Sequence, residues 1–432
     1  MDPFATYMKE KMLEKIIFMC LYPPELDGSA YSNEEFTQGL SRKGYNIEVV
    51  AQPCEGDKKY DLKSEEEHNI KIHRVPIKLE YEGSPPPMMQ LNKVVKFIYD
   101  ILISKKINNG DSPDLVVLGH DSWAWYQPLA HQFGMPVIQH LRGTPTRSIT
   151  KGIYSPKKTK EYLECVLGAD FIVPLAHHFE ELMISQGYPE ERMTTIHNGV
   201  DTKLFYPKNK TNNTSKLKQE LNIPEDHQII VHASNHYPVK RVKDIISSAD
   251  KVLEQRNDVT YLIIGEGPET ESIKNAAASS DYNSHFRLIG AVPYKKIADY
   301  LRLGEIFILS SESEGFARAT VEAQACGLYL IMSDMPAGIE RTDNGTRGTN
   351  YKMGDYNDLA DKTLDVLNMD QIKRAEICER GLNFAHTECS FETQLNKYEG
   401  VLQRVYSMFN RNKETSPILR PDSILTRERL SS

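Results

Sequence analysis

Short apolar segments alternate with amphipathic ones along most of this chain. The first apolar segment, Lys15–Leu21, is followed by Pro23 and Pro24 and predicts a buried strand. A turn at Gly28 and a helical pattern come next, and Ile47–Ala51 predicts a second strand. This order of strand, glycine turn, helix and strand begins a βαβ unit.

The same alternation continues through both halves of the chain. In the first half, strands are predicted at Ile70–Val75, Asp114–Leu118, Pro136–His140, Phe171–Val173 and Thr194–His197, and helices at Leu91–Lys105, Ala124–Phe133, Tyr162–Leu167 and His177–Gln186. In the second half, strands are predicted at Gln228–Ala233, Tyr261–Ile264, Phe286–Leu288, Ile306–Leu309 and Tyr329–Met332. Helices are predicted there at Val242–Gln255, Glu269–Ala277, Tyr294–Arg302, Ala317–Cys326, Asp358–Leu367 and Gln371–Phe384. Short strands that alternate with helices form parallel, doubly wound sheets, so we predict an α/β fold in both halves.

A polar segment separates the two halves. After a turn at Asn198–Asp201, Tyr206–Ser215 carries few apolar residues and is interpreted as an interdomain linker. The predicted domains are therefore residues 1–205 and 206–390. Apolar residues at helical spacing follow in Phe391–Phe409, which we expect to pack as a helix, whereas the charged, Ser-rich tail 410–432 is expected to be disordered.

The composition argues against several classes of protein. The 432 residues suffice for two domains, and a net charge of −8 with a pI near 6.0 argues against nucleic acid as the main partner. No apolar run approaches the roughly 20 residues that span a bilayer, so no integral membrane segment is predicted. The six cysteines show no CxxC spacing, which disfavours a zinc knuckle or a disulfide framework.

The expected location is cytoplasmic. The N-terminus shows no charged-then-apolar signal followed by a cleavage site, and scattered cysteines are typical of a reducing compartment. Basic residues at Lys151 and Lys157–Lys160 would permit peripheral contact with an anionic membrane, although a solvated loop explains them as well.

The most informative segment follows the predicted strand Ile306–Leu309. A loop there holds Glu314 and Gly315, and a helix is predicted to begin near Ala317. Ligands of open α/β sheets bind at the carboxyl ends of strands, where a helix N-terminus offers N–H groups to phosphate. Glu314 and Glu322 can accept hydrogen bonds from sugar hydroxyls, each worth roughly 1.5–3 kcal/mol. Two solvated glutamates at the start of a helix are the alternative.

The spacing of Glu314 and Glu322 resembles the E-x7-E element of retaining glycosyltransferase family 4. Further landmarks follow in the family's order, at His197–Asp201, Ile264–Pro268, Leu288–Gly290, Ser333–Asp334, Gly338 and Gly354–Asp355. The resemblance spans about Lys15 to Phe409. It implies the GT-B fold, in which two Rossmann-like doubly wound domains face a cleft and the C-terminal helix, here residues 391–409, crosses back onto the first domain.

The resemblance also implies an activity. A UDP- or GDP-linked sugar would be transferred, with retained anomeric configuration, to a hydroxyl acceptor in the synthesis of a glycan, a glycolipid or a small-molecule glycoside. Glu314 corresponds to a ligand of the donor sugar and Glu322 to a ligand of the ribose. The other donor-binding candidates outside the diphosphate element are Gly28, Val292, Gly315, Phe316 and Ala317.

The diphosphate-binding element departs from the family pattern at one position. Lys240 stands where the family has the lysine that neutralises the departing phosphate, but Asn235 replaces the arginine that precedes it. Arg241 and Arg318 are therefore candidates to supply the missing charge. Locally, the segment Ser234–Arg241 resembles the subgroup that makes glucosaminyl-malate.

Two residues of the first half are candidates for the acceptor side. His120 follows a predicted strand at the position of the family's active-site histidine, and a packed structural histidine is its alternative. Arg142 stands before Gly143 where many members have His-Gly, which suggests contact with an anionic acceptor group. The expected catalytic residues are thus His120, Lys240 and Glu314.

No metal or other cofactor is expected for the transfer, because no DxD-type pair follows a strand near the motif. The donor is a substrate, and nucleic acid is not expected as a partner. Two other classes compete with the transferase. One is a non-catalytic nucleotide-sugar-binding subunit, which Asn235 and Arg142 leave open although Glu314, Lys240, Glu322 and His120 together argue against it. The other is another GT-B enzyme such as an epimerase or a phosphorylase. A phosphorylase would require a pyridoxal-binding lysine site.

Overall fold

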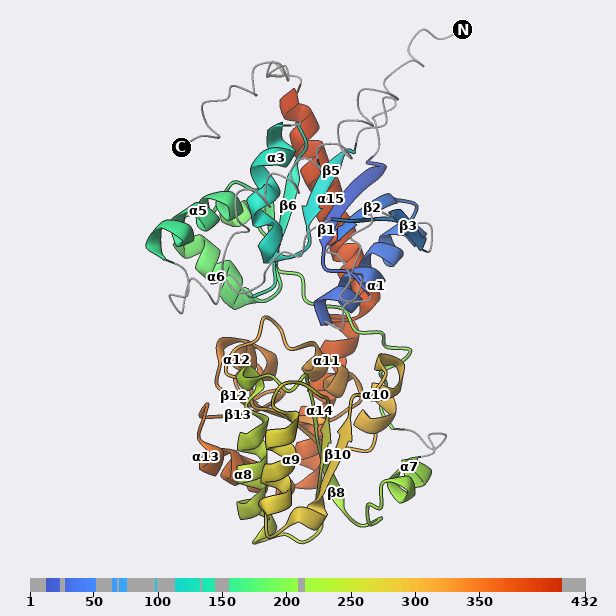
Figure 1. Ribbon diagram of the computed structural model, residues 1–432, viewed down its shortest axis with the longest axis vertical. Helices are drawn as coiled ribbons and strands as arrows, with labels where there is room; N and C mark the ends of the chain where they lie inside the picture. Colours follow the sequence, from blue (N-terminus) through green and yellow to red (C-terminus); the bar gives the residue numbers. More distant parts are fainter. Residues whose placement is uncertain are drawn as a thin grey trace. The chain divides into compact units, whose positions relative to one another are not determined.

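A computed structural model of the protein describes residues 13–23, 28–51, 64–67, 70–75, 98, 113–132, 134–143, 155–208 and 214–413. By their contacts the residues form two compact units. The first contains residues up to Leu175, Phe179–Ile196 and the chain from Leu395 on, and the second contains Ala176–His178 and His197–Gln394. Each unit has its own sheet (Figure 1).

The first unit is built on a seven-stranded sheet in the order β3-β4-β2-β1-β5-β6-β7. The strands are β1 Lys15–Cys20, β2 Asn46–Ala51, β3 Ser64–Glu67, β4 Ile70–Arg74, β5 Leu115–Leu118, β6 Val137–Leu141 and β7 Phe171–Pro174. All neighbours are parallel except β3 and β4. Every residue of β1 is buried, as expected for a continuous apolar run at the centre of a parallel sheet. Its helices are α1 Gly28–Arg42, η1 Asp121–Tyr126, α3 Gln127–Gln132, α5 Pro156–Leu167 and η2 Glu190–Arg192, together with α6 His177–Ser185 from Phe179 on and α15 Phe391–Lys413 from Leu395 on.

The second unit has a six-stranded, fully parallel sheet in the order β10-β9-β8-β11-β12-β13. Its strands are β8 Gln228–Ala233, β9 Val259–Ile264, β10 Phe286–Gly290, β11 Ile306–Leu309, β12 Tyr329–Ser333 and β13 Gly348–Tyr351. Numbered from β8, this is the order 3-2-1-4-5-6 of a Rossmann sheet. The first sheet has the same order once the antiparallel edge strand β3 is set aside. The prediction of two Rossmann-like domains is confirmed.

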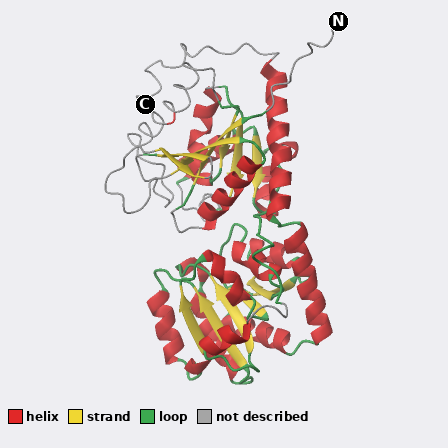
Figure 2. Ribbon diagram, turned by 90° about the vertical axis from the view of Figure 1, so that its right-hand side faces the viewer, coloured by secondary structure: helices red, strands yellow, loops and turns green. Residues whose placement is uncertain are grey.

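Helices cover both faces of the second sheet (Figure 2). They are α7 Thr214–Glu220, η3 Pro238–Lys240, α8 Val242–Leu253, α9 Thr270–Ser279, η4 Asn283–His285, α10 Tyr294–Leu301, α11 Arg318–Ala325, α12 Pro336–Thr342, α13 Tyr356–Leu367 and α14 Gln371–Thr387. The apolar face of α8 packs with α13 and the strands into one core, to which Val242, Ile245 and Leu359 contribute fully buried side chains. The sheet is therefore held firmly on this side, which fixes the ends of its strands.

Some local predictions were wrong. Thr194–His197 is not a strand: Met193 forms an isolated bridge with Ile172, and the chain then runs beside β7 with hydrogen bonds at alternate residues only. The predicted linker is partly helical, because α7 begins at Thr214. The C-terminal helix also continues past its predicted end at Phe409, to Lys413.

The division into units differs from the predicted boundary at 205/206. Residues from His197 on belong to the second unit, because Val200 N–H donates to the carbonyl of Cys389 and Phe391 N–H donates back to the carbonyl of Val200. The helix predicted at 91–105, except Ile98, and the tail 414–432 lie outside the described residues. Within the described part of the chain, no helix is both long and apolar enough to span a membrane.

Candidate active site

The loops after β8 and β11 meet at the carboxyl edge of the second sheet. These strands are neighbours although β9 and β10 come between them in sequence, so the chain reverses its direction of winding there. Such a switch point is where open α/β sheets bind ligands. The loops are joined directly, because Glu312 N–H donates to the carbonyl of Val239 at 2.9 Å and Ser310 Oγ donates to the carbonyl of Lys240 at 2.8 Å.

An ion pair joins the two loops at this edge. The ammonium Nζ of Lys240 lies 2.6 Å from Oε1 of Glu314, and Ser311 Oγ donates to the same oxygen at 2.6 Å. The side chains are 22% and 11% exposed, so the pair is mostly shielded from water yet reachable. The structure thus brings together the two residues predicted to hold the phosphate and the sugar of a donor.

The helix that follows begins with an unusual backbone conformation. Ala317, at its N-cap, has φ 57° and ψ 69°, in the left-handed region, and α11 begins at Arg318 rather than at Ala317 as predicted. Arg318 Nε donates to Glu322 Oε1 at 3.0 Å. The guanidinium also lies 4.7 Å from the ring centre of Tyr294 and donates to its hydroxyl. Arg318 and Glu322 are therefore held as a pair at the start of this helix.

Arg241, the other candidate for the missing positive charge, is held differently. Its own backbone is left-handed, with φ 50°, and its Nε donates to Asp244 at 2.7 Å. That hydrogen bond raises the pKa of the Arg241 guanidinium. Asn235 is exposed, and Val292, in the loop after β10, is half-buried.

The side chain of Phe316 is buried and does not face solvent. Its ring stacks on His197 with a centroid distance of 4.6 Å and an interplanar angle of 13°, and the guanidinium of Arg341 lies 3.7 Å from its ring centre. Arg341 is itself only 2% exposed, and burial lowers the pKa of its guanidinium. Phe316 therefore anchors the loop and leaves its backbone as the part available to a ligand. No motif or pattern in the sequence indicated Arg341, which occupies an ordinary helical position in α12.

The remaining predicted residues lie in the first unit. Its winding reverses between β1 and β5; Gly28 begins α1 after β1, and buried His120 follows β5. Arg142, just after β6, is 8% exposed; its Nη1 lies 3.5 Å from Ser32 Oγ and its Nη2 lies 3.4 Å from Nδ1 of His140. A guanidinium enclosed in this way can pair with an anionic group at the carboxyl edge of the sheet.

Burial keeps His140 neutral. It lowers the pKa of this imidazole well below 6.5, and the positive charge of Arg142 lowers it further. Nε2 of His140 is hydrogen-bonded to the hydroxyl of Tyr398 in α15. The first unit thus holds a neutral histidine and a buried arginine side by side, which the sequence did not predict.

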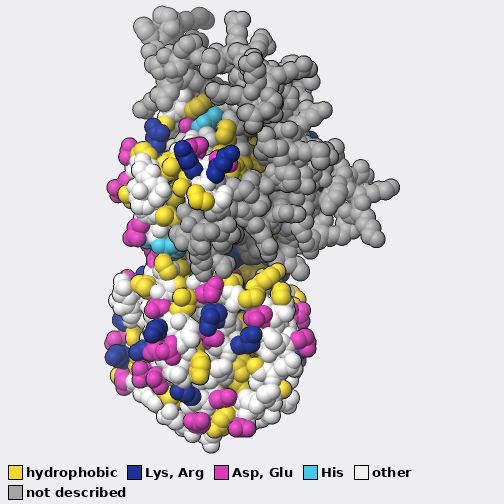
Figure 3. Space-filling model, turned by 60° about the vertical axis from the view of Figure 1, so that its left-hand side comes forward, with side chains coloured by type: hydrophobic (Ala, Val, Ile, Leu, Met, Phe, Trp, Pro, Cys, Tyr) yellow, Lys and Arg dark blue, Asp and Glu magenta, His cyan; other side chains and the backbone are white. Residues whose placement is uncertain are grey.

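The charged surface of the second unit is mixed in sign. Figure 3 shows acidic and basic side chains interspersed over one face of this unit. A ligand on this face would therefore be recognised by local charges, such as Lys240 with Glu314, and not by a large surface patch of one charge.

Two family models match different halves of the chain. The model described as Glycosyl transferases group 1 matches residues 213–383, and the one described as Glycosyltransferase Family 4 matches residues 26–204. N-acetyl-alpha-D-glucosaminyl L-malate synthase from Bacillus anthracis is 22% identical over 387 residues, which cover 88% of this chain and 94% of the relative. The chain belongs to glycosyltransferase family 4.

The fold of this family 4 glycosyltransferase is also found in solved structures. Sucrose-phosphate synthase from Thermosynechococcus elongatus matches with a TM-score of 0.73 and 16% identity, covering 91% of this chain and all of that one. HepE from Anabaena, solved in complex with UDP and glucose, matches with a TM-score of 0.70 and 15% identity over 90% of this chain and all of that one. The architecture is GT-B, with two Rossmann-like domains.

Proposed function

We propose that this glycosyltransferase moves a sugar from a nucleoside-diphosphate donor to a hydroxyl acceptor with retention of anomeric configuration. The observation that carries the proposal is the pairing of Lys240 with Glu314 at the switch point, beside the N-terminus of α11. A diphosphate at this edge would meet the ammonium and the N–H groups of the helix, and a sugar next to it would meet the carboxylate.

The donor is proposed to be UDP-linked, with a GDP-linked sugar as the alternative. HepE is named as a complex with UDP and glucose, and the Bacillus anthracis relative is named for an N-acetylglucosaminyl product. We therefore expect UDP-N-acetylglucosamine to be the first donor to test. Glu322 would contact the ribose, and the pair that it forms with Arg318 would orient its carboxylate.

The acceptor is proposed to carry an anionic group next to its hydroxyl. Arg142 is buried beside His140, and an enclosed guanidinium pairs well with a carboxylate. L-malate, the hydroxy acid in the name of the Bacillus anthracis relative, is a suitable first acceptor. His120 is proposed to contact the reacting groups from the end of β5.

Retention is proposed to occur by attack on the same face from which the phosphate leaves. The bond between the anomeric carbon and the phosphate oxygen breaks, the acceptor oxygen bonds to that carbon, and its proton passes to the departing phosphate. Glu314 is a poor candidate for a nucleophile, because its Oε1 already accepts hydrogen bonds from Lys240 and Ser311. Lys240 would stabilise the charge on the leaving phosphate, which is the main catalytic contribution expected here.

The test combines donor binding with turnover. UDP-, GDP- and ADP-linked sugars are screened for a rise in melting temperature, since a ligand that binds only the folded state stabilises it. Transfer to L-malate is then measured for the wild type, Glu314→Ala and Glu312→Ala. We expect Glu314→Ala to abolish transfer with an unchanged fold, and Glu312→Ala, in the same loop, to keep most of the activity. Full activity of Glu314→Ala would overturn the site assignment.

A non-catalytic donor-binding subunit is the second candidate. It is favoured by Asn235 at the position of the family's arginine and by the pairing of Arg241 and Arg318 with carboxylates of their own helices. Thermal stabilisation by a nucleotide sugar without transfer or hydrolysis would support it over the enzyme.

A further inference from the structure

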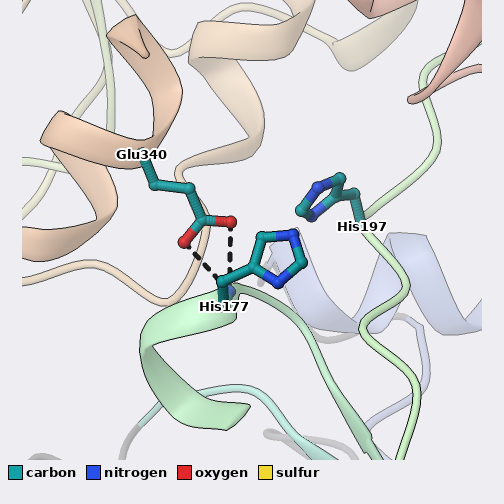
Figure 4. Close-up of side chains that lie close together, drawn as sticks. All are labelled: His177, His197 and Glu340. Carbon is teal, nitrogen blue, oxygen red and sulfur yellow. Dashed lines mark hydrogen bonds between the residues drawn. The ribbon is translucent and has the colours of Figure 1, made fainter. Parts of the chain in front are cut away.

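Two histidines and a glutamate lie together outside the proposed donor site. They are His177 at the start of α6, His197 in the segment after η2, and Glu340 in α12 (Figure 4). All three belong to the second unit. One potential ligand atom from each lies within 4.8 Å of the others, and the described residues contain no other such set of three His, Cys, Asp or Glu side chains.

Two of the three side chains are held in place. The Glu340 carboxylate accepts from the backbone N–H of His177 at 3.0 and 3.1 Å and lies 3.5 Å from Nδ1 of His178. The ring of His197 is fixed by its stack on Phe316. Figure 4 shows the rings of His177 and His197 side by side, and their centroids are 5.7 Å apart at 88°. His177 is exposed, so its ring can turn toward the other two.

The spacing is close to what a small divalent ion requires. Zinc binds histidine nitrogen at about 2.0–2.1 Å and carboxylate oxygen at about 2.0–2.2 Å, which places tetrahedral ligands roughly 3.3 Å apart. The separations of up to 4.8 Å exceed this spacing, so the side chains would have to move closer together when an ion binds. Two imidazoles with one carboxylate favour Zn²⁺, Co²⁺, Ni²⁺ or Cu²⁺, whereas Mg²⁺ and Ca²⁺ prefer oxygen ligands alone.

We propose that His177, His197 and Glu340 bind a divalent transition-metal ion, with Zn²⁺ as the expected ion. Water would complete its coordination, since His177 is open to solvent. None of the three side chains is among the residues proposed to contact the donor, although His197 stacks on Phe316 in the loop that carries Glu314.

The test uses the untagged, full-length chain after treatment with a chelator. Co²⁺ is titrated while its visible d–d absorption is recorded, and Zn²⁺ is then added as a competitor. We expect one ion per chain, bands of the intensity typical of four- or five-coordinate Co²⁺, and their loss when Zn²⁺ displaces it. His177→Ala should weaken binding by at least about tenfold, since even losing a group that only supports a metal ligand costs 10- to 100-fold.

Two further variants make the test specific. Glu340→Gln keeps an oxygen that can accept from the His177 N–H but removes the charge, and it should also weaken binding with an unchanged circular dichroism spectrum. His285→Ala is the matched control. His285 also lies beside another histidine, His227, with ring centroids 5.6 Å apart, but no third His, Cys, Asp or Glu among the described residues joins them in a group that could bind a metal ion. It should bind as the wild type does. Equal binding by the wild type and His177→Ala, or no wild-type binding below millimolar concentrations, would overturn the proposal.

Discussion

The ammonium of Lys240 and the carboxylate of Glu314 are in direct contact, 2.6 Å apart, across two loops that are far apart in sequence. In the proposed reaction these groups face different parts of the donor, the phosphate and the sugar. Their contact therefore makes Glu314 a competitor of the diphosphate for Lys240. It also keeps the lysine at the edge of the sheet before a donor binds.

This competition predicts a split between binding and transfer. Glu314→Gln removes a negative charge beside the diphosphate and releases Lys240, so the affinity for UDP alone should rise by about 1 kcal/mol, or roughly fivefold. Transfer should fall by at least about 100-fold, because the sugar loses its carboxylate ligand. Calorimetric titration with UDP and steady-state transfer assays measure the two effects, with Glu312→Gln as the control. Unchanged or weaker UDP binding by Glu314→Gln would contradict the competition.

The contact of Arg318 with Tyr294 predicts that the donor KM rises in steps as first the hydroxyl and then the ring of Tyr294 is removed. The Tyr294 ring lies under the guanidinium and its hydroxyl accepts from it, while Glu322 accepts from Nε. Tyr294→Phe keeps the ring and should raise the donor KM about twofold to threefold, whereas Tyr294→Ala should raise it about tenfold with little change in kcat. Steady-state kinetics with varied donor separates these outcomes. Equal KM values in the two variants would show that the ring does not position Arg318.

Much of the fold could be predicted because the central strands are continuous apolar runs. Strands β8, β9, β11 and β12 are buried along nearly their whole lengths, which is the pattern of a parallel sheet. Strand β13, Gly348–Tyr351, was not predicted, because its sequence GTNY has no apolar run and its two middle residues are only half-buried. Helix α12 is seven residues long and has too few positions to show a helical period.

The site was predictable only as far as it follows from strand order. Lys240 and Glu314 each follow a buried strand, so a doubly wound sheet places both at one edge. The partners of individual side chains could not be predicted in this way. His177, His197 and Glu340 come from three distant segments, and the stack of His197 on Phe316 depends on packing that no local pattern encodes.

The left-handed backbone of Ala317 predicts that valine is less well tolerated there than at Ala319, inside the helix. A residue with a side chain at φ 57° costs about 1–2 kcal/mol, and a β-branched side chain costs more. Ala317 already carries that cost, so Ala317→Val adds only the further strain of the β-branched side chain, on the order of 1 kcal/mol. It should also weaken donor binding, because the first N–H groups of α11 would be displaced. Ala319→Val, inside the helix, should cost only about 0.5 kcal/mol. Urea unfolding compares them, and equal losses would show that the left-handed conformation at Ala317 is not retained.

His232 predicts how stability changes with pH. Its ring, on β8, is buried, with Nδ1 near the carbonyl of Ile308 and Nε2 near Ser234 Oγ, and burial lowers its pKa from 6.5 to about 4. Below pH 6.5 the unfolded chain takes up a proton on His232 that the folded chain does not. The contribution of this residue to the free energy of unfolding is therefore present at pH 7 and is lost as the pH falls toward 4. The loss from this residue between pH 7 and 5 should be about 2 kcal/mol. His232→Asn keeps a donor near Ile308 but cannot titrate, so its unfolding free energy should depend less on pH by that amount. Urea unfolding at both pH values, followed by circular dichroism, measures the difference. Parallel pH dependence in the two proteins would show that folding does not lower the pKa of His232.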